Sequence, residues 1–167
     1  MKNLNLLPTG ISPETLAAED SEPAVSRNIS VTVRPMSVLI MDDEDSILEI
    51  LGEMLAFLGH RVTESLDGAE AIRLVKEHVE SDAPFDLVIL DLTVPGGLGG
   101  REALLEIRKI DPDVRAIVSS GYANDPVMAD YSAHGFDYYV SKPFKMNELS
   151  VAIRAVAEQM EKQPRKG

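Results

Sequence analysis

The stretch Val38-Leu39-Ile40-Met41-Asp42-Asp43-Glu44 (residues 38–44) runs from four apolar side chains directly into three acidic ones. A second stretch repeats this pattern, since Leu87-Val88-Ile89-Leu90 (residues 87–90) ends at Asp91. Short apolar runs bounded by polar residues are typical of strands buried on both faces, and open α/β sheets place their ligand sites at the carboxyl ends of such strands. We therefore expect Asp42, Asp43 and Asp91 to meet at one edge of a parallel sheet.

Three converging carboxylates predict a divalent metal site. Like charges a few ångströms apart repel strongly at low effective dielectric, so a cation or a shared proton must neutralise the cluster. Oxygen ligands without His or Cys favour Mg²⁺. In this interpretation Asp43 and Asp91 hold the ion.

Composition narrows the class of protein. A chain of 167 residues with 44% hydrophobic and 26% charged residues predicts one globular domain. The net charge of -12 disfavours nucleic-acid binding, and the lack of cysteine excludes a disulfide framework or a thiolate zinc site. No secretory signal is evident, and no segment approaches the ~20 apolar residues of a membrane helix. We expect a cytoplasmic protein that does not bind membranes.

The chain divides into three parts. Prolines recur among Ser, Glu and Ala near the start, which predicts a flexible N-terminal segment or linker over residues 1–36. Apolar runs then alternate with amphipathic stretches, which predicts βα repeats over residues 37–160, followed by a C-terminal tail at 161–167. Strands are expected at about 37–41, 61–65, 86–90, 114–118 and 137–140. Five helices are expected: about 45–58, one capped by Asp67, one ending at Ile110, one opened by Asp125-Pro126, and about 147–160.

The later strand ends add a hydroxyl and an amine to the acids, because Ser119 or Ser120 follows the fourth apolar run and Lys142 the fifth. A carboxylate can accept a phosphoryl group when a divalent cation, a hydroxyl donor and an ammonium neutralise the charges. The glycine-rich loop at 96–100 lacks a P-loop lysine and is interpreted as a turn. The three histidines show no metal-ligand spacing and are expected on surfaces or at helix ends; they are His60, His78 and His134.

Four motifs in order resemble the receiver domains of two-component response regulators, over about residues 37–160. They are Asp42-Asp43, Asp91, Ser120-Gly121 and Lys142-Pro143-Phe144. The resemblance implies a flavodoxin-like α/β fold, a doubly wound five-stranded parallel sheet of order 2-1-3-4-5 with five helices. The flanking residues are most similar to receivers of hybrid sensor histidine kinases.

The resemblance also implies a role for each site residue. Asp91 would accept the phosphoryl group and Asp43 would bind Mg²⁺ directly, while Asp42 would act through water and Thr93 would offer its backbone carbonyl to the ion. Ser120, rather than Ser119, would be the switch hydroxyl, and Lys142 would pair with a phosphoryl oxygen. The bond from Lys142 to Pro143 would be cis, Tyr139 would be the aromatic switch, and Thr93 and Tyr122 would tune the lifetime of the acyl phosphate.

The implied donor is a histidine kinase or a phosphotransfer protein, and the chain would hydrolyse its own phosphoryl group slowly. Homodimerisation, the downstream effector and the choice between a stand-alone receiver and part of a hybrid kinase stay open.

The main alternative is a phosphohydrolase of the haloacid-dehalogenase type, whose nucleophile opens a D-x-D-x-[TV] run; Asp91-Leu92-Thr93-Val94 lacks the second acid. Tyr139 could also be only a half-buried strand aromatic.

Overall fold

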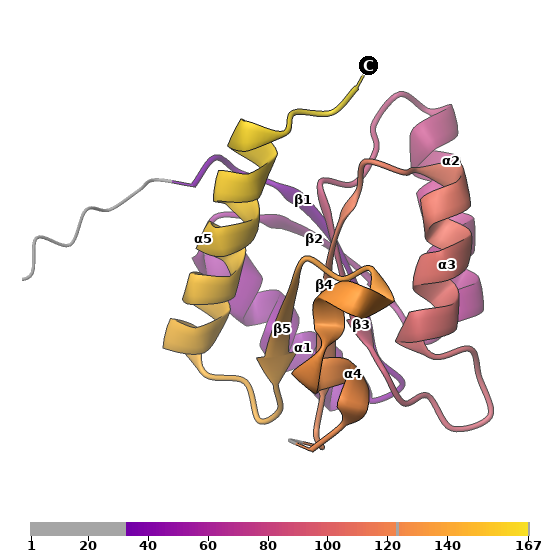
Figure 1. Ribbon diagram of the computed structural model, residues 1–167, viewed down its shortest axis with the longest axis vertical. Coiled ribbons are helices and arrows are strands. Elements are labelled where there is room, and N and C mark those ends of the chain that lie inside the picture. The colour runs from indigo at the N-terminus through magenta and orange to yellow at the C-terminus, as the bar shows by residue number, and fades with distance from the viewer. Residues whose placement is uncertain (1–32, 123, 167) are drawn as a thin grey trace, which may run out of the picture. The chain divides into compact units, whose positions relative to one another are not determined.

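The computed structural model describes residues 33–122 and 124–166 (Figure 1). The predicted flexible segment, residues 1–36, lies outside these described residues except for 33–36. The folded part contains one parallel sheet of order β2-β1-β3-β4-β5, which confirms the predicted flavodoxin-like topology. The strands are β1 (Ser37–Met41), β2 (Arg61–Ser65), β3 (Leu87–Asp91), β4 (Arg115–Ser120) and β5 (Tyr138–Ser141).

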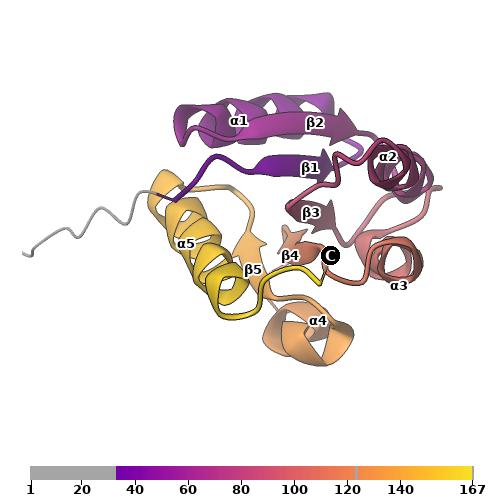
Figure 2. The same cartoon turned by 90° about the horizontal axis from the view of Figure 1, so that it is seen from above.

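Helices follow the strands along the chain and cover both faces of the sheet. They are α1 (Asp45–Phe57), α2 (Gly68–Glu80), α3 (Gly100–Ile110), α4 (Pro126–Ala129), the short 3₁₀ helix η1 (Tyr131–His134) and α5 (Met146–Lys162). Figure 2 shows α1 and α5 on one face and α2 and α3 on the other. None of the helices in the described residues is long and apolar enough to cross a bilayer.

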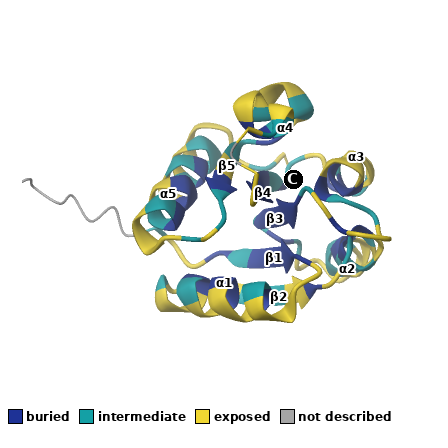
Figure 3. Cartoon of the chain, turned by 90° about the horizontal axis from the view of Figure 1, so that it is seen from below, coloured by how far each residue is buried: buried dark blue, intermediate teal, exposed yellow. Residues whose placement is uncertain are grey.

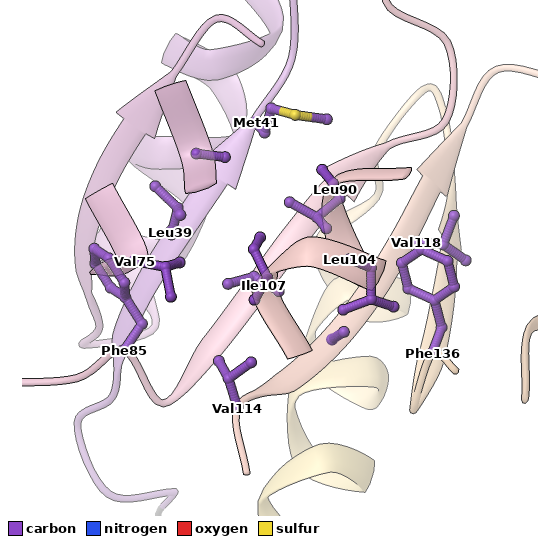
Figure 4. Close-up of a cluster of buried hydrophobic side chains, with 14 of the residues drawn as sticks. Leu39, Met41, Val75, Phe85, Leu90, Leu104, Ile107, Val114, Val118 and Phe136 are labelled. Atoms are coloured by element: carbon purple, nitrogen blue, oxygen red, sulfur yellow. The ribbon is translucent and has the colours of Figure 1, made fainter. Parts of the chain in front are cut away.

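Two hydrophobic clusters, one on each face, fix the sheet between the helices. Because side chains alternate along a strand, Leu39 and Met41 face α2 and α3, whereas Val38 and Ile40 face α1 and α5. The strands β1, β3 and β4 are almost wholly buried, whereas β2 is partly exposed and the outer sides of the helices are largely exposed (Figure 3). Figure 4 shows the first cluster, where Leu104 of α3 packs among the strand side chains. Burial of both faces explains why these strands read as continuous apolar runs.

The two predicted helix caps are present. Asp67 accepts a hydrogen bond from the amide of Glu70 at 2.9 Å, and the Glu70 carboxylate accepts one from the amide of Leu66 at 3.0 Å. The side chain of Asp125 accepts from the amide of Val127 at 2.8 Å at the start of α4. Side-chain oxygens thus satisfy amides that have no partner within the helix.

Several element boundaries differ from the sequence prediction, and the differences bear on the site. β3 includes Asp91, and β4 extends to Ser120, so these polar residues are held by the sheet rather than by loops. The fourth helix is a single turn followed by η1. The last helix runs two residues further than expected, to Lys162.

The histidines were predicted on surfaces or at helix ends, and for His60 this did not anticipate burial. His60 directly follows the α1 turn, but its side chain is buried, and its Nδ1 atom accepts the amide of Met36 at 3.2 Å. Burial lowers the pKa of His60, opposed by the nearby charge of Asp86.

The glycine-rich loop brings the start of α3 against the end of β3. A Cβ atom on Gly100 would lie 2.6 Å from the carbonyl oxygen of Asp91 and 2.9 Å from the Cβ of Leu90. A side chain does not fit there without moving the backbone. The loop is therefore a packing turn, as predicted, and it sets the position of α3 relative to Asp91.

We expect Gly100→Ala to lower the free energy of unfolding by about 1–3 kcal/mol, because the added methyl group clashes with strand backbone. Urea denaturation of the metal-free protein measures this change. The control is Gly121→Ala, where an added Cβ would meet nothing within 4 Å and stability should be unchanged. Equal stability of the two variants would contradict the close approach of α3.

Candidate active site

An ammonium and two buried carboxylates meet at the carboxyl edge of the sheet. Asp42 directly follows β1, Asp91 ends β3 and Lys142 directly follows β5. The Nζ atom of Lys142 lies 2.6 Å from Oδ2 of Asp42 and 3.1 Å from Oδ1 of Asp91. Three segments far apart in sequence thus place their charges in contact, because their strands are parallel.

Asp43 completes an acidic cluster with these two aspartates. Asp42, Asp43 and Asp91 each offer a carboxylate oxygen, and the three atoms all lie within 4.8 Å of one another. Their exposure differs sharply, because Asp42 and Asp91 are 1% and 4% exposed while Asp43 is open to solvent. The cluster therefore has a buried side and an accessible side.

Hydrogen bonds fix Asp42 at the end of its strand. Its amide donates to the carbonyl of Ser65 at 3.1 Å, and its Oδ1 atom accepts the amide of Glu44 at 3.1 Å. The Oδ2 atom is fully buried and has no hydrogen bond of ordinary geometry, although the Lys142 ammonium is within ion-pair distance. The resemblance implied that Asp42 acts on the ion through water, and its direct contact with Lys142 was not predicted.

The pKa values of Asp91 and Lys142 are shifted by burial and by the charges of the ion pair. Burial raises the pKa of Asp91 to about 6, with the charge of Asp42 acting in the same direction and Lys142 and the Thr93 amide opposing it. For Lys142, burial acts to lower the pKa, but its interactions with Asp42 and Asp91 outweigh burial and leave the pKa raised. Lys142 is therefore a stable cation, whereas the ionised form of Asp91 is costly.

The donor set fits a magnesium ion. Three carboxylates share one ammonium, which leaves the cluster short of positive charge. All the side-chain donors are oxygens, which suit a hard cation, and an exposed carboxylate on one side leaves room for coordinated water.

The cluster opens into a cleft lined by further loop residues. Thr93 and Tyr122, which the resemblance singled out, lie in this lining. Glu44 and Pro95 also line it, and neither was predicted from the sequence. The adjacency of Glu44 to the aspartate pair was the available clue, but acids in that position also favour the start of a helix.

The two candidate serines are both buried at the end of β4. Strand register pairs Ser119 with Asp91 and Ser120 with Ser141. The Ser120 carbonyl accepts the amide of Lys142 at 2.9 Å, and its hydroxyl accepts the amide of Tyr122 at 3.1 Å. Ser120 is thus tied to Lys142 through the backbone, and its role as the switch hydroxyl stays a prediction.

The predicted aromatic switch lies in a group of three tyrosine rings on the β5 side of the molecule. Tyr139 is 42% exposed, and its ring centroid lies 5.5 Å from that of Tyr138 and 5.3 Å from that of Tyr131. The bond between Lys142 and Pro143 is cis, as the resemblance implied.

The raised pKa of Asp91 predicts how the stability of the metal-free protein changes with pH. Because the native state binds its proton more tightly than the unfolded chain, this stabilisation is complete below the ordinary pKa of 3.8 and is lost as pH rises through about 6. Asp91→Asn removes the effect. Its stability relative to the wild type should therefore increase by up to about 3 kcal/mol between acidic and neutral pH.

Urea denaturation of both proteins in chelator at a series of pH values measures this difference. A difference that stayed constant from about pH 4 to pH 7 would contradict a raised pKa for Asp91.

Known proteins have similar sequences and a similar fold. The response regulator receiver domain family matches residues 38–154. The chain is 38% identical over 125 residues to a probable transcriptional regulator, ycf27, of Guillardia theta, covering 75% of this chain and 46% of that protein. It is 31% identical over 125 residues to the sensor kinase CckA of Brucella abortus, covering 75% of this chain and 13% of the kinase. The chain thus spans less than half the length of these two relatives.

A solved structure with the same fold contains the expected ion. The receiver domain of the sensor histidine kinase PA1611 from Pseudomonas aeruginosa, with magnesium coordinated in its active site cleft, is 26% identical with a TM-score of 0.64. The match covers 74% of this chain and 98% of that domain. The family match, the strand order and these relatives together identify the chain as a member of the response regulator receiver domain family.

Proposed function

We propose that this chain takes a phosphoryl group from a histidine kinase or a phosphotransfer protein onto Asp91, and that Mg²⁺ is required. The observation that carries the proposal is the Lys142 ammonium in contact with two buried carboxylates, beside an exposed third one. Receiver domains of this family work with such donors in two-component systems, and Asp91 is the carboxylate of the buried pair that also lines the open cleft.

The chemistry is a transfer of the phosphoryl group between nitrogen and oxygen. The carboxylate of Asp91 attacks phosphorus, an O–P bond forms, and the N–P bond of the phosphohistidine breaks. The leaving imidazole nitrogen takes up a proton. Later attack by water on phosphorus returns the Asp91 carboxylate and releases inorganic phosphate.

The residues of the cleft have separate roles in this step. Asp43, Asp91 and the carbonyl of Thr93 would hold the ion, with Asp42 assisting from the buried side. Mg²⁺, when bound, supplies positive charge that offsets the charge building up on the phosphoryl oxygens. Lys142 is already within 3.1 Å of Asp91, so it is placed to pair with an oxygen of the group once that group is attached.

The phosphorylated state would be read out on the face formed by α4, β5 and α5. Ser120 would turn its hydroxyl toward the phosphoryl group, and Tyr139 would move into the space behind it. In this proposal the phosphoryl group shifts the population between two packings by contacting one of them better than the other.

A phosphohydrolase of the haloacid-dehalogenase type is not favoured. The strand order and the family match are those of receivers, and the run after Asp91 lacks the second acid of that class. We further propose that residues 37–160 form the receiver, with 1–36 as a flexible N-terminal segment or linker and 161–167 as a C-terminal tail. A sensor kinase and a probable transcriptional regulator are both among the relatives. If the chain is part of a longer protein, it could therefore be joined either to a kinase or to a regulatory output domain.

The acceptor is tested by labelling with a small phosphodonor such as acetyl phosphate in the presence of Mg²⁺. Asp91→Asn should abolish the acid-labile label, because an amide is not a nucleophile for this reaction. The matched control is Asp82→Asn, because Asp82 is exposed and its φ of 56° is one that asparagine tolerates. The control should label as the wild type does, and wild-type label on Asp91→Asn would sink the assignment.

The metal site is tested by binding, independently of phosphorylation. We expect Asp43→Asn to weaken Mg²⁺ binding by roughly tenfold or more, because a direct charged ligand is lost. Titration with Mg²⁺ while amide NMR shifts around residues 91–93 are followed measures the affinity. Asp82→Asn again serves as the control. Unchanged affinity in the Asp43 variant would place the ion elsewhere.

A further inference from the structure

The four residues after α5, Gln163 to Lys166, cross the amino edge of the sheet, opposite the acidic cleft. We name residues 163–166 the C-terminal strap. One guanidinium nitrogen of Arg165 contacts both carboxylate oxygens of Asp111, at 3.0 and 2.9 Å, and the other donates to the carbonyl of Phe85. Asp111 is 5% exposed and follows α3 directly.

A second and a third contact hold the same segment. The amide of Lys166 donates to the carboxylate of Asp113 at 3.0 Å, and the guanidinium of Arg115 donates to the carbonyl of Gln163 at 3.1 Å. The strap is therefore fixed at both of its ends. A buried carboxylate paired with a guanidinium is a strong contact, because removing one partner leaves the other charge buried and unpaired.

The guanidinium of Arg115 also connects the strap to the beginning of β5. Its other terminal nitrogen lies 3.0 Å from Oδ1 of Asp137, the residue directly before β5. The Oδ2 atom of Asp137 accepts the amide of Ala116 at 2.8 Å and contacts Arg108 at 3.2 Å. One side chain thus bridges the strap and the strand that carries Tyr139.

We propose that the C-terminal strap is a conformational restraint on β5. Docked through Arg165, it holds Arg115 against Asp137 and fixes the amino end of β5. When the strap is released, the start of β5 opens away from β4 more often, while the rest of the sheet stays paired. A partner, or a pull on the chain, that removes Arg165 from Asp111 would therefore loosen β5, which carries Tyr138 and Tyr139, without contacting the acidic cleft.

Amide hydrogen exchange tests the restraint in the whole chain without ligand. Arg165→Gln should speed exchange roughly tenfold or more at the amides of Gln163, Lys166 and residue 165 and, to a smaller extent, in residues 138–141, because a charge-assisted contact is lost. Residues 37–41 of β1 report global unfolding and should be unchanged. The control is Lys166→Gln, which removes one positive charge from the strap but keeps the backbone contact to Asp113.

The segments in which exchange becomes faster decide whether the strap restrains β5. Faster exchange in both segments of Arg165→Gln, with the control like the wild type, supports the restraint. Faster exchange in the strap alone shows a passive tail, and no change in either segment shows that the strap is not docked; either result overturns the proposal. If Arg165→Gln unfolds the whole chain, Arg165→Lys keeps the charge and should show the same pattern at smaller amplitude.

Discussion

The ion pair of Lys142 with Asp42 and Asp91 is the interaction on which the site depends. Two carboxylates buried at one sheet edge repel each other, and only a positive charge placed between them makes their burial tolerable. One ammonium partly neutralises them, and the pKa of Asp91 stays raised because burial outweighs the help of Lys142. The cluster is thus folded but short of positive charge. A divalent cation can supply the missing positive charge.

The sheet brings these charges together by topology rather than by local sequence. The aspartates lie at the ends of neighbouring strands β1 and β3, and Lys142 reaches them from β5, beyond the intervening β4. Helix packing on both faces holds the strands in register, so the distance between the charges is set by two hydrophobic clusters. The absence of a side chain on Gly100 adds to this, since α3 can then begin against the carbonyl of Asp91. The packing of the core therefore also fixes the geometry of the site.

Sequence reasoning reached the strands and the polar residues at their ends, because each depends on a local pattern: an apolar run followed by a polar residue. The strand order and the roles of Thr93, Ser120 and Tyr122 came from the resemblance to receiver domains. It placed Asp91 and Ser120 just outside their strands, since a polar residue at a strand end reads like a loop. It missed the buried state of His60 and the docking of Arg165. Both depend on partners far away in sequence, Met36 and Asp111, and no period or spacing records such pairs.

The two edges of the sheet manage their charges in opposite ways. At the amino edge, three acids that precede strands pair with arginines in the described residues: Asp86 with Arg34, Asp111 with Arg165, and Asp137 with Arg108 and Arg115. Guanidinium groups satisfy carboxylates with several hydrogen bonds in a fixed geometry, so these pairs are suited to holding segments in place. At the carboxyl edge three acids share a single lysine. Ion pairs at the amino edge can anchor segments of the chain. The carboxyl edge has excess negative charge, so it has capacity to bind a cation. This difference in charge separates the structural edge of the sheet, at the amino ends of the strands, from the proposed reactive edge at their carboxyl ends.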